Sequence, residues 1–328
     1  MADVATLAEV SIKTVSRVVN DEPGVRSETA TRVKAVIDEL GFHRHEGASM
    51  LRKGRSTSIG LIVEDLANPW YSQLAAAMER EARGRGHFLI STSAEGSSAR
   101  EAELVDALVA RRVEGLVVVP ASVVASAEIA SAAQEIPVVC VDRPLPGLLA
   151  DTVLSDNEGG VRSAVEHLVA HRHQRIGFLG DHAGVWTAQQ RLAAFCASLD
   201  ALGMVVPATT RLGPYAPGEV AALLARWTQG PDPISAIITS NNRVTLQVIS
   251  AVREGGLDLV VIGYDDFELA DFLDPPVTCV HQDPAALGER AIQQLFARLD
   301  GERGEPRTFV IPTRLIVRGV PRRPAHTR

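Results

Sequence analysis

The sequence has few cysteines and aromatic residues and no long apolar run. Aromatic residues make up 4% of the 328 residues. No run reaches the roughly 18 apolar residues that a membrane span needs, so we expect no contact with a membrane. The N-terminus lacks a basic segment followed by an apolar one, which favours a cytoplasmic location over secretion. The cysteines lie far apart in apolar contexts and form no CxxC pair, so we expect three reduced core residues: Cys140, Cys196 and Cys279.

Motifs that indicate an enzyme are also missing. No GxGxxG follows the first apolar run, no Walker loop occurs, and no Ser-His-Asp or Cys-His set stands out. His167 and His171 have the spacing of a metal pair on a helix, but we favour a role at a helix C-terminus, where the dipole suits histidine. We therefore predict no catalytic residue, no cofactor and no metal. Acidic residues at strand ends leave a sugar-processing enzyme as an alternative.

Charge is distributed unevenly along the chain. The net charge is −7, yet residues 1–56 hold nine basic and eight acidic residues and so carry +1, which leaves −8 for the rest. A chain with this asymmetry can bind DNA through its N-terminal part, because the acidic remainder is repelled by the phosphates.

Residues 1–41 have the pattern of three short helices. The second is expected over residues 12–20 with Ser11 as its N-cap, and the third over residues 27–40, ending at Gly41. The first two helices are joined by the tight turn Glu9-Val10-Ser11, which is typical of a helix-turn-helix. The apolar spacing predicts inward-facing Val4, Leu7, Ala8, Val15, Val18, Val19, Val33, Val36, Ile37 and Leu40.

After a basic connector, the chain alternates short apolar runs with amphipathic stretches, which is typical of βαβ units with parallel sheets. The number of runs favours two sheets. The strand runs are Ile59–Val63, Phe88–Ile90, Leu116–Val119, Val138–Val141, Ile176–Leu179, Ala236–Ile238 and Leu259–Ile262. Helices are expected over Tyr71–Arg85, Arg100–Ala110, Val161–His171, Ala188–Leu202 and Thr245–Glu254, among others.

Polar residues follow many of these strands. In open parallel sheets, ligands bind beyond the carboxyl ends of the strands. Asp, Asn and Arg offer the acceptors and forked donors that match neighbouring hydroxyl groups, and Trp and Tyr offer flat apolar faces for a ring. The alternative for any single Asx is the N-cap of the next helix. The strand-end groups are Glu64-Asp65, Asn68 to Tyr71, Asp142-Arg143, Ser155 to Asn157, Thr239 to Asn242, and Gly263 to Asp266.

With both halves in view, the chain resembles the LacI/GalR family of bacterial transcription regulators over nearly its whole length. Its larger part is similar to periplasmic sugar-binding proteins of the ribose type. The resemblance implies an α/β protein, with an N-terminal three-helix helix-turn-helix module and a two-lobed periplasmic-binding-protein-like sensor with parallel sheets. The segments that carry it are Asp3-Val4-Ala5, Val10 to Asn20, Leu51 to Ser56, Asn68 to Tyr71, Gly263 to Asp266, and Pro275 to Thr278.

The resemblance places residues 12–20 in the major groove of DNA as the recognition helix. Arg17 is expected to reach a guanine edge, Ile12 a thymine methyl group, and Leu51 a base step in the minor groove. The alternatives are a solvated helix face for Lys13 and Arg17 and a linker residue packed on the sensor for Leu51. The implied DNA-binding residues are Ser11, Ile12, Lys13, Thr14, Ser16, Arg17, Asn20 and Leu51.

The same resemblance implies a sugar-like effector, such as a pentose or a related polyol or nucleoside. A surface salt bridge is the alternative role for Arg191. The ligand-binding residues carried over from the ribose-type pattern are Asn68, Trp70, Tyr71, Asp142, Arg143, Arg191, Asn241, Asp265 and Gln282.

The family also implies a domain plan and partners. Residues 1–44 would form the helix-turn-helix, residues 45–57 the hinge, and residues 58–328 the sensor. One lobe would hold about 58–155 and 284–312, and the other about 156–283 and 313–320. A homodimer would bind a near-palindromic double-stranded DNA operator as a repressor. The alternative is a solute-binding receptor without a DNA role.

One departure from the family pattern falls in the helix-turn-helix turn. The usual glycine there is Glu9 in this chain, so we expect a non-glycine residue with a positive φ, at a conformational cost of roughly 1 kcal/mol.

Overall fold

The computed structural model describes residues 2–19, 22–40 and 57–319, and its contacts divide the chain into two units, residues 1–56 and 57–328. Each unit is described by itself. Asn20, Leu51 and nearly all of the predicted hinge lie outside the described residues.

The first unit contains three helices, α1 (Ala2–Leu7), α2 (Ile12–Val19) and α3 (Ser27–Glu39). The turn before α2 has the predicted strain, since Glu9 has a φ of 50°. The Thr14 amide donates to Ser11 Oγ at 3.1 Å, which is the N-cap contact expected at this helix start. The buried core of the unit consists of Val4, Ala5, Ala8, Val15, Val18 and Val33.

Two residues predicted to face this core are exposed instead. Leu7 is 58% exposed and Leu40 is 43% exposed. Leu7 is the last residue of α1 and Leu40 is the C-cap of α3, so each stands at a helix end rather than against a neighbouring helix. The helical spacing of apolar residues predicts which face of a helix is buried, but it does not show at which residue along the helix the burial ends.

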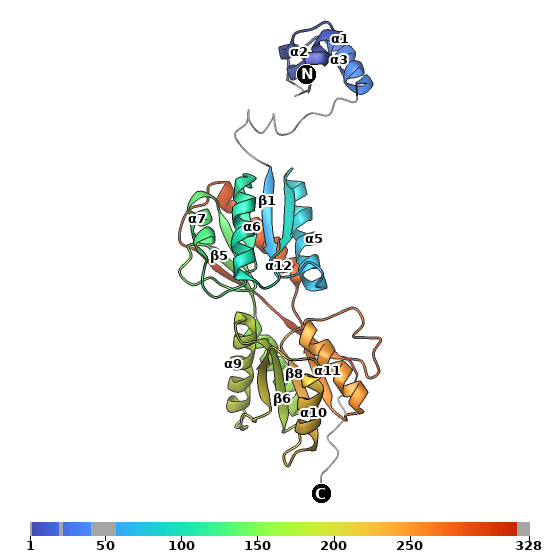
Figure 1. Cartoon of the computed structure of the whole chain (residues 1–328), viewed down its shortest axis with the longest axis vertical. Helices are drawn as coiled ribbons and strands as arrows, with labels where there is room; N and C mark the ends of the chain where they lie inside the picture. Colours follow the sequence, from blue (N-terminus) through green and yellow to red (C-terminus); the bar gives the residue numbers. More distant parts are fainter. Residues whose placement is uncertain (1, 20–21, 41–56, 320–328) are drawn as a thin grey trace. The chain divides into compact units, whose positions relative to one another are not determined.

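In the second unit, the first of two sheets has the strand order β11-β5-β4-β3-β1-β2, with every neighbouring pair parallel. We call this sheet and its helices lobe 1. Buried residues of α5 and α12 pack on one face of the sheet, and those of α6 and α7 on the other (Figure 1). The elements are β1 (Ser58–Val63), α5 (Pro69–Gly84), β2 (Phe88–Ser93), α6 (Ser98–Ala110), β3 (Gly115–Val118), α7 (Ala127–Glu135), β4 (Val138–Val141), β5 (Asp151–Ser155), α12 (Pro284–Leu299) and β11 (Thr308–Ile311).

The second sheet, with its helices called lobe 2, has the order β12-β10-β9-β8-β6-β7. Only β12 runs antiparallel to its neighbour. Helices α8 and α9 cover one face, and α10 and α11 cover the other. The elements are α8 (Asn157–Ala170), β6 (Ile176–His182), α9 (Trp186–Ala201), β7 (Thr210–Gly213), α10 (Glu219–Gln229), β8 (Ala236–Thr239), α11 (Asn242–Gly255), β9 (Val260–Tyr264), β10 (Thr278–His281) and β12 (Arg314–Ile316).

The chain passes between the lobes three times, after β5, after β10 and after β11. Thr313 lies in the third crossing and donates its hydroxyl to the Asp156 carbonyl in the first, at 3.1 Å. Neither lobe is therefore a continuous segment of sequence.

The two-sheet α/β architecture predicted from the sequence is confirmed. Five strands were not among the predicted runs: β5, β7, β10, β11 and β12. Strands β5 and β10 are buried but contain polar residues such as Asp151, Thr152 and Thr278, whereas β7, β11 and β12 are half-exposed. Cys140 and Cys279 are buried and free as expected, whereas Cys196 is only half-buried because it faces the edge of the lobe 2 core. No helix among the described residues has the length and apolar character of a membrane span.

The contact between α5 and α12 requires a glycine. A Cβ atom added at Gly288 would lie 2.6 Å from the Leu74 carbonyl oxygen, so the two backbones are too close for any side chain. We expect Gly288→Ala to lower the free energy of unfolding by about 1–3 kcal/mol, measured by urea denaturation. Gly84→Ala is the matched control in α5, because its added methyl group meets nothing within 4 Å. Equal effects of the two substitutions would refute this account.

Candidate functional site

A polar cavity lies between the two lobes of the second unit. Lobe 1 contributes the residues after β1 and β4, and lobe 2 those after β6, β8 and β9. All nine residues predicted to bind ligand line this one cavity: Asn68, Trp70, Tyr71, Asp142, Arg143, Arg191, Asn241, Asp265 and Gln282.

The lobe 1 wall is organised around the buried side chain of Arg143. Its Nη2 donates to Glu64 Oε2 at 2.5 Å and to the Tyr71 hydroxyl at 3.3 Å, while Nη1 donates to the Pro120 carbonyl at 3.1 Å. Its Nε lies 3.4 Å from Asp142 Oδ2. Burial raises the pKa of Tyr71 well above its ordinary value, so this hydroxyl stays neutral. The guanidinium is thus fixed in place by groups from three loops.

The lobe 2 wall is organised around Arg191, which is 3% exposed. Its Nε donates to Asn157 Oδ1 at 2.7 Å, and its Nη1 donates to the Ser240 carbonyl at 2.5 Å. The guanidinium lies over the Tyr264 ring, 3.8 Å from the centroid. The surface salt bridge considered for Arg191 is therefore wrong, because helix α9 turns this side chain into the lobe rather than toward solvent.

Asp142 and Asp265 occupy equivalent places in the two lobes, directly after β4 and β9. Both have a left-handed backbone, with φ of 67° and 65°, a conformation that Asp tolerates better than most residues. Asp265 accepts hydrogen bonds from Gln282 Nε2 and from the Asn242 amide. Burial raises the pKa of both carboxyl groups, and Arg191 acts in the opposite direction on each. The fold thus holds two acidic groups where desolvation disfavours their charge.

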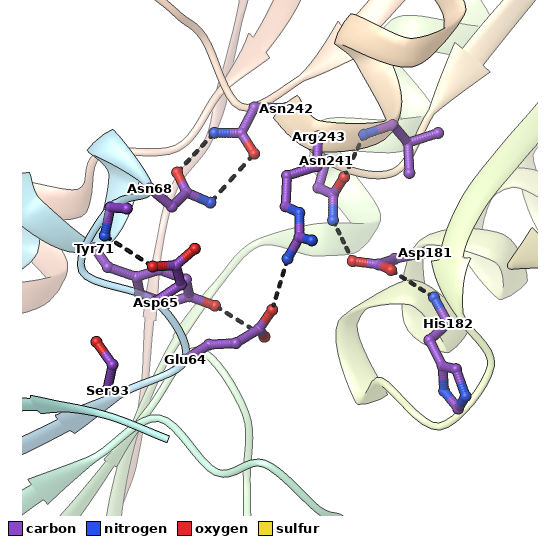
Figure 2. A network of polar contacts seen from close by, with 12 residues as sticks. Glu64, Asp65, Asn68, Tyr71, Ser93, Asp181, His182, Asn241, Asn242 and Arg243 are labelled. Atoms are coloured by element: carbon purple, nitrogen blue, oxygen red, sulfur yellow. Dashed lines mark hydrogen bonds and ion pairs between the residues drawn. The ribbon is translucent and has the colours of Figure 1, made fainter. Parts of the chain in front are cut away.

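Side chains from the two lobes meet across the cavity, as Figure 2 shows. Asn68 and Asn242 form a reciprocal amide pair, with N–O distances of 2.8 and 3.3 Å. Arg243 Nη1 lies 3.5 Å from Glu64 Oε1. These contacts join the turn after β1 to the start of α11, so the structure has a closed cleft.

The N-cap alternative holds for two of the predicted ligand contacts. The Asn68 side chain accepts from the Trp70 amide at 3.1 Å, and the Asn241 side chain accepts from the Val244 amide at 2.9 Å. The Asn241 amide nitrogen also donates to Asp181 at 2.6 Å. Each of these asparagines caps a helix and lines the cavity at the same time.

Six polar residues that line the cavity were not among the predicted contacts: Glu64, Asp181, Thr187, Ser240, Asn242 and Arg243. Asp181 lies at the carboxyl end of β6, so the strand-end rule could have found it. Ser240 and Asn242 were recognised in the polar group after β8 but were not carried over as ligand contacts. Arg243 lies in the first turn of α11, where a sequence pattern predicts a solvated helix start. Glu64 was recognised at its strand end but was not among the residues carried over from the ribose-type pattern.

In the first unit, the described residues of the predicted DNA contacts gather on α2. Ser11, Ile12 and Lys13 are exposed, whereas Thr14, Ser16 and Arg17 are half-buried. Ile12 is 55% exposed although it is apolar. Asn20 and Leu51 lie outside the described residues.

His167 and His171 lie at the C-terminal end of helix α8. His171 is the C-cap of α8, and its Nδ1 lies 2.8 Å from the His167 carbonyl oxygen. Burial, followed by the neighbouring His171, lowers the pKa of His167. Among the described residues, no group of three or more His, Cys, Asp or Glu side chains is arranged to hold a metal ion.

Comparison with known proteins agrees with both units. A family model described as "Bacterial regulatory proteins, lacI family" matches residues 1–45, and one described as "Periplasmic binding protein-like domain" matches residues 165–319. The HTH-type transcriptional regulator PtxS of Pseudomonas plecoglossicida is 32% identical to this chain, over 97% of the chain and 94% of its own length. The chain belongs to the lacI family of bacterial regulatory proteins.

Two further comparisons bear on the site. The ribose operon repressor of Escherichia coli (strain K12) is 30% identical over 91% of the chain and 92% of its own length. A crystal structure of the Lac repressor dimer, bound to operator and the anti-inducer ONPF, has a TM-score of 0.85 at 27% identity. The match covers 96% of this chain and 97% of that one. The protein is thus a DNA-binding transcription regulator with a periplasmic-binding-protein-like sensor, not an enzyme.

The buried carboxyl group of Asp265 gives the first prediction for the cavity. Because burial raises its folded-state pKa, the stability of the protein increases as the pH falls through that raised value toward the ordinary 3.8. We expect Asp265→Asn to raise the free energy of unfolding at neutral pH, by on the order of 1 kcal/mol, and to flatten this pH dependence. Thermal unfolding across a pH series measures both effects.

Asp106→Asn is the control, since Asp106 is an exposed residue of α6. If Asp265→Asn destabilises the protein at neutral pH, attraction to Arg191 outweighs desolvation and this account of the carboxyl group is wrong.

Proposed function

We propose that the regulator is a repressor that binds a near-palindromic operator as a homodimer. Its effector is a small sugar-like molecule, a pentose or a related polyol or nucleoside, bound in the cavity between the lobes of the sensor. Binding changes the relative stability of the open and closed sensor and thereby the affinity for DNA.

The convergence of hydrogen-bonding groups in the cavity carries this proposal. Within the described part of the chain, Trp70 Nε1 and Gln282 Oε1 are buried without a hydrogen-bond partner. Both residues line the cavity, and a ligand hydroxyl group can accept from the indole and donate to the amide. A buried polar atom without a partner is costly, so a hydroxyl-rich ligand would stabilise the closed sensor.

The other walls suit the same kind of ligand. Asp142 and Asp265 offer carboxyl groups from opposite lobes, and Arg143 and Arg191 offer fixed guanidinium forks. Trp70 and Tyr71 meet edge to face, with ring centroids 5.0 Å apart, and border the cavity with apolar surface for a sugar ring. The similarity to a ribose operon repressor supports a pentose.

For DNA, the proposal uses the residues of α2 and the connector. Exposed Lys13 and half-buried Arg17 supply positive charge on α2, and exposed Ile12 supplies an apolar contact at its start. Leu51, in the hinge proposed for residues 45–57, would enter the minor groove. The division of contacts after Ser56 supports the proposed start of the sensor, and the three crossings between lobes support the proposed lobe boundaries. The proposed boundary between helix-turn-helix and hinge, at residues 44 and 45, lies outside the described residues.

The ligand site is tested by a substitution that keeps the positive charge of a side chain but removes its forked guanidinium group. We expect Arg191→Lys to weaken binding of the best pentose or polyol at least about tenfold, because lysine cannot reproduce the guanidinium fork. Isothermal titration calorimetry measures the change, and operator binding without sugar should be retained in a gel shift. Arg162→Lys, an exposed residue of α8, is the control. Unchanged sugar affinity in Arg191→Lys would refute the assignment.

The DNA contact is tested on the gene's own upstream region. We expect Arg17→Ala to weaken operator binding by about 1–3 kcal/mol, roughly 5- to 150-fold, and to relax the base preference at one position of each half-site. Lys34→Ala removes the same charge from α3 and should have a smaller effect that does not depend on the operator sequence. A gel shift in which no upstream sequence is retarded would favour the solute-receptor alternative.

A further inference from the structure

We infer that the cavity selects uncharged ligands and rejects those that carry a phosphate or carboxylate group, and that Glu64 sets this selection. The inference rests on the proposed function, because it concerns the ligand of the same cavity. The inference distinguishes two classes of ligand. Free sugars and polyols are expected to bind, whereas sugar phosphates and sugar acids are expected to be rejected, although both classes have the hydroxyl groups that the cavity walls recognise.

The charges that line the cavity leave no surplus of positive charge. Four carboxyl groups face three guanidinium groups, so the fully ionised cavity carries a net charge of −1. Burial raises the pKa of Asp142 and Asp265, and the uptake of one proton by this pair makes the cavity neutral. In neither state does the cavity attract an anion.

Two of the guanidinium groups are engaged by the same carboxylate. Arg143 Nη2 donates to Glu64 Oε2 at 2.5 Å, and Arg243 Nη1 lies 3.5 Å from Glu64 Oε1. A phosphate or carboxylate that approaches either arginine meets the charge of Glu64 at contact distance. Placing like charges together in a partly desolvated site is unfavourable, and this is how a site rejects a molecule of the wrong charge.

The third guanidinium group gives an anion no better partner. Arg191 is held by the Asn157 side chain and the Ser240 carbonyl, and Asp142 and Asp265 are the acidic groups that act on it from both lobes. Asp181 adds a fourth carboxylate to the cavity and is hydrogen-bonded to Asn241 and the His182 amide. An anionic ligand at Arg191 would therefore be close to several acidic groups at once.

Glu64 differs from the other acids in its position. Its side chain is 16% exposed and stands where the two lobes meet, between the Tyr71 hydroxyl and Arg243 (Figure 2). Asp142 and Asp265 lie deeper, at strand ends on opposite walls, where they suit sugar hydroxyl groups. Neutralising Glu64 would remove the one carboxylate that Arg143 and Arg243 share, while Arg143 keeps its contacts with Asp142 and the Pro120 carbonyl. Both deeper acids would stay in place. Glu64 is therefore the specificity-determining residue for ligand charge.

The test uses the full-length protein and isothermal titration calorimetry with two matched series. The neutral series contains aldopentoses and pentitols, and the anionic series contains the corresponding pentose 5-phosphates and pentonates. For the wild type, we expect each anion to bind at least about tenfold more weakly than its neutral parent. We expect Glu64→Gln to reduce this ratio toward unity and Glu64→Asp, which keeps the charge, to preserve much of it.

Glu268→Gln is the matched control, because Glu268 is exposed and does not line the cavity. An anion that binds the wild type as tightly as its neutral parent overturns the inference and leaves the sugar-binding function intact. A ratio that is the same in Glu64→Gln and the wild type overturns the role of Glu64. If no member of either series binds, the proposed ligand class fails, and the inference fails with it.

Discussion

The parallel pairing of strands is the constraint on which the site depends. In lobe 1 every strand, and in lobe 2 every strand except β12, points its carboxyl end toward the same edge of its sheet. The loops after β1, β4, β6, β8 and β9 therefore leave at edges that face a common cavity. Short apolar strands with polar residues directly after them are enough to bring Asp142, Arg143 and Asp265 together, although more than 120 residues separate the first from the last.

The convergence of strand ends places charged side chains in a buried cavity, where the loss of water disfavours their ionised forms. Asp142 and Asp265 have strained backbones and raised pKa values, and Arg143 and Arg191 are almost completely buried. Each of these features lowers stability compared with an apolar replacement of similar shape. Apolar packing on both faces of each sheet supplies the stability that tolerates them. Buried charge and a left-handed backbone coincide at the cavity, which is typical of sites that recognise a ligand.

Much of this structure could be predicted from the sequence, and the exceptions have physical reasons. Apolar runs predicted seven strands, most of them buried on both faces, whereas the half-exposed β7, β11 and β12 and the buried but partly polar β5 and β10 were not among them. Likewise, strand-end position and family resemblance together placed nine residues at one cavity. Asn242 was recognised at its strand end but not as a ligand contact, and Arg243 was missed, because the importance of both arises only when α11 meets the turn after β1 across the cleft. A contact between segments more than 170 residues apart leaves no local pattern in either segment.

The interleaving of the two lobes has a consequence for how the protein is made. On the ribosome, β1 to β5 emerge first, but the sheet of lobe 1 lacks its edge strand β11 and one helical layer lacks α12 until residues beyond 300 have been synthesised. Lobe 2 likewise waits for β12. The three-helix unit at the N-terminus needs only its first 40 residues for its core, so it can fold long before the sensor is complete. During synthesis, the helix-turn-helix unit can therefore be complete before the sensor is.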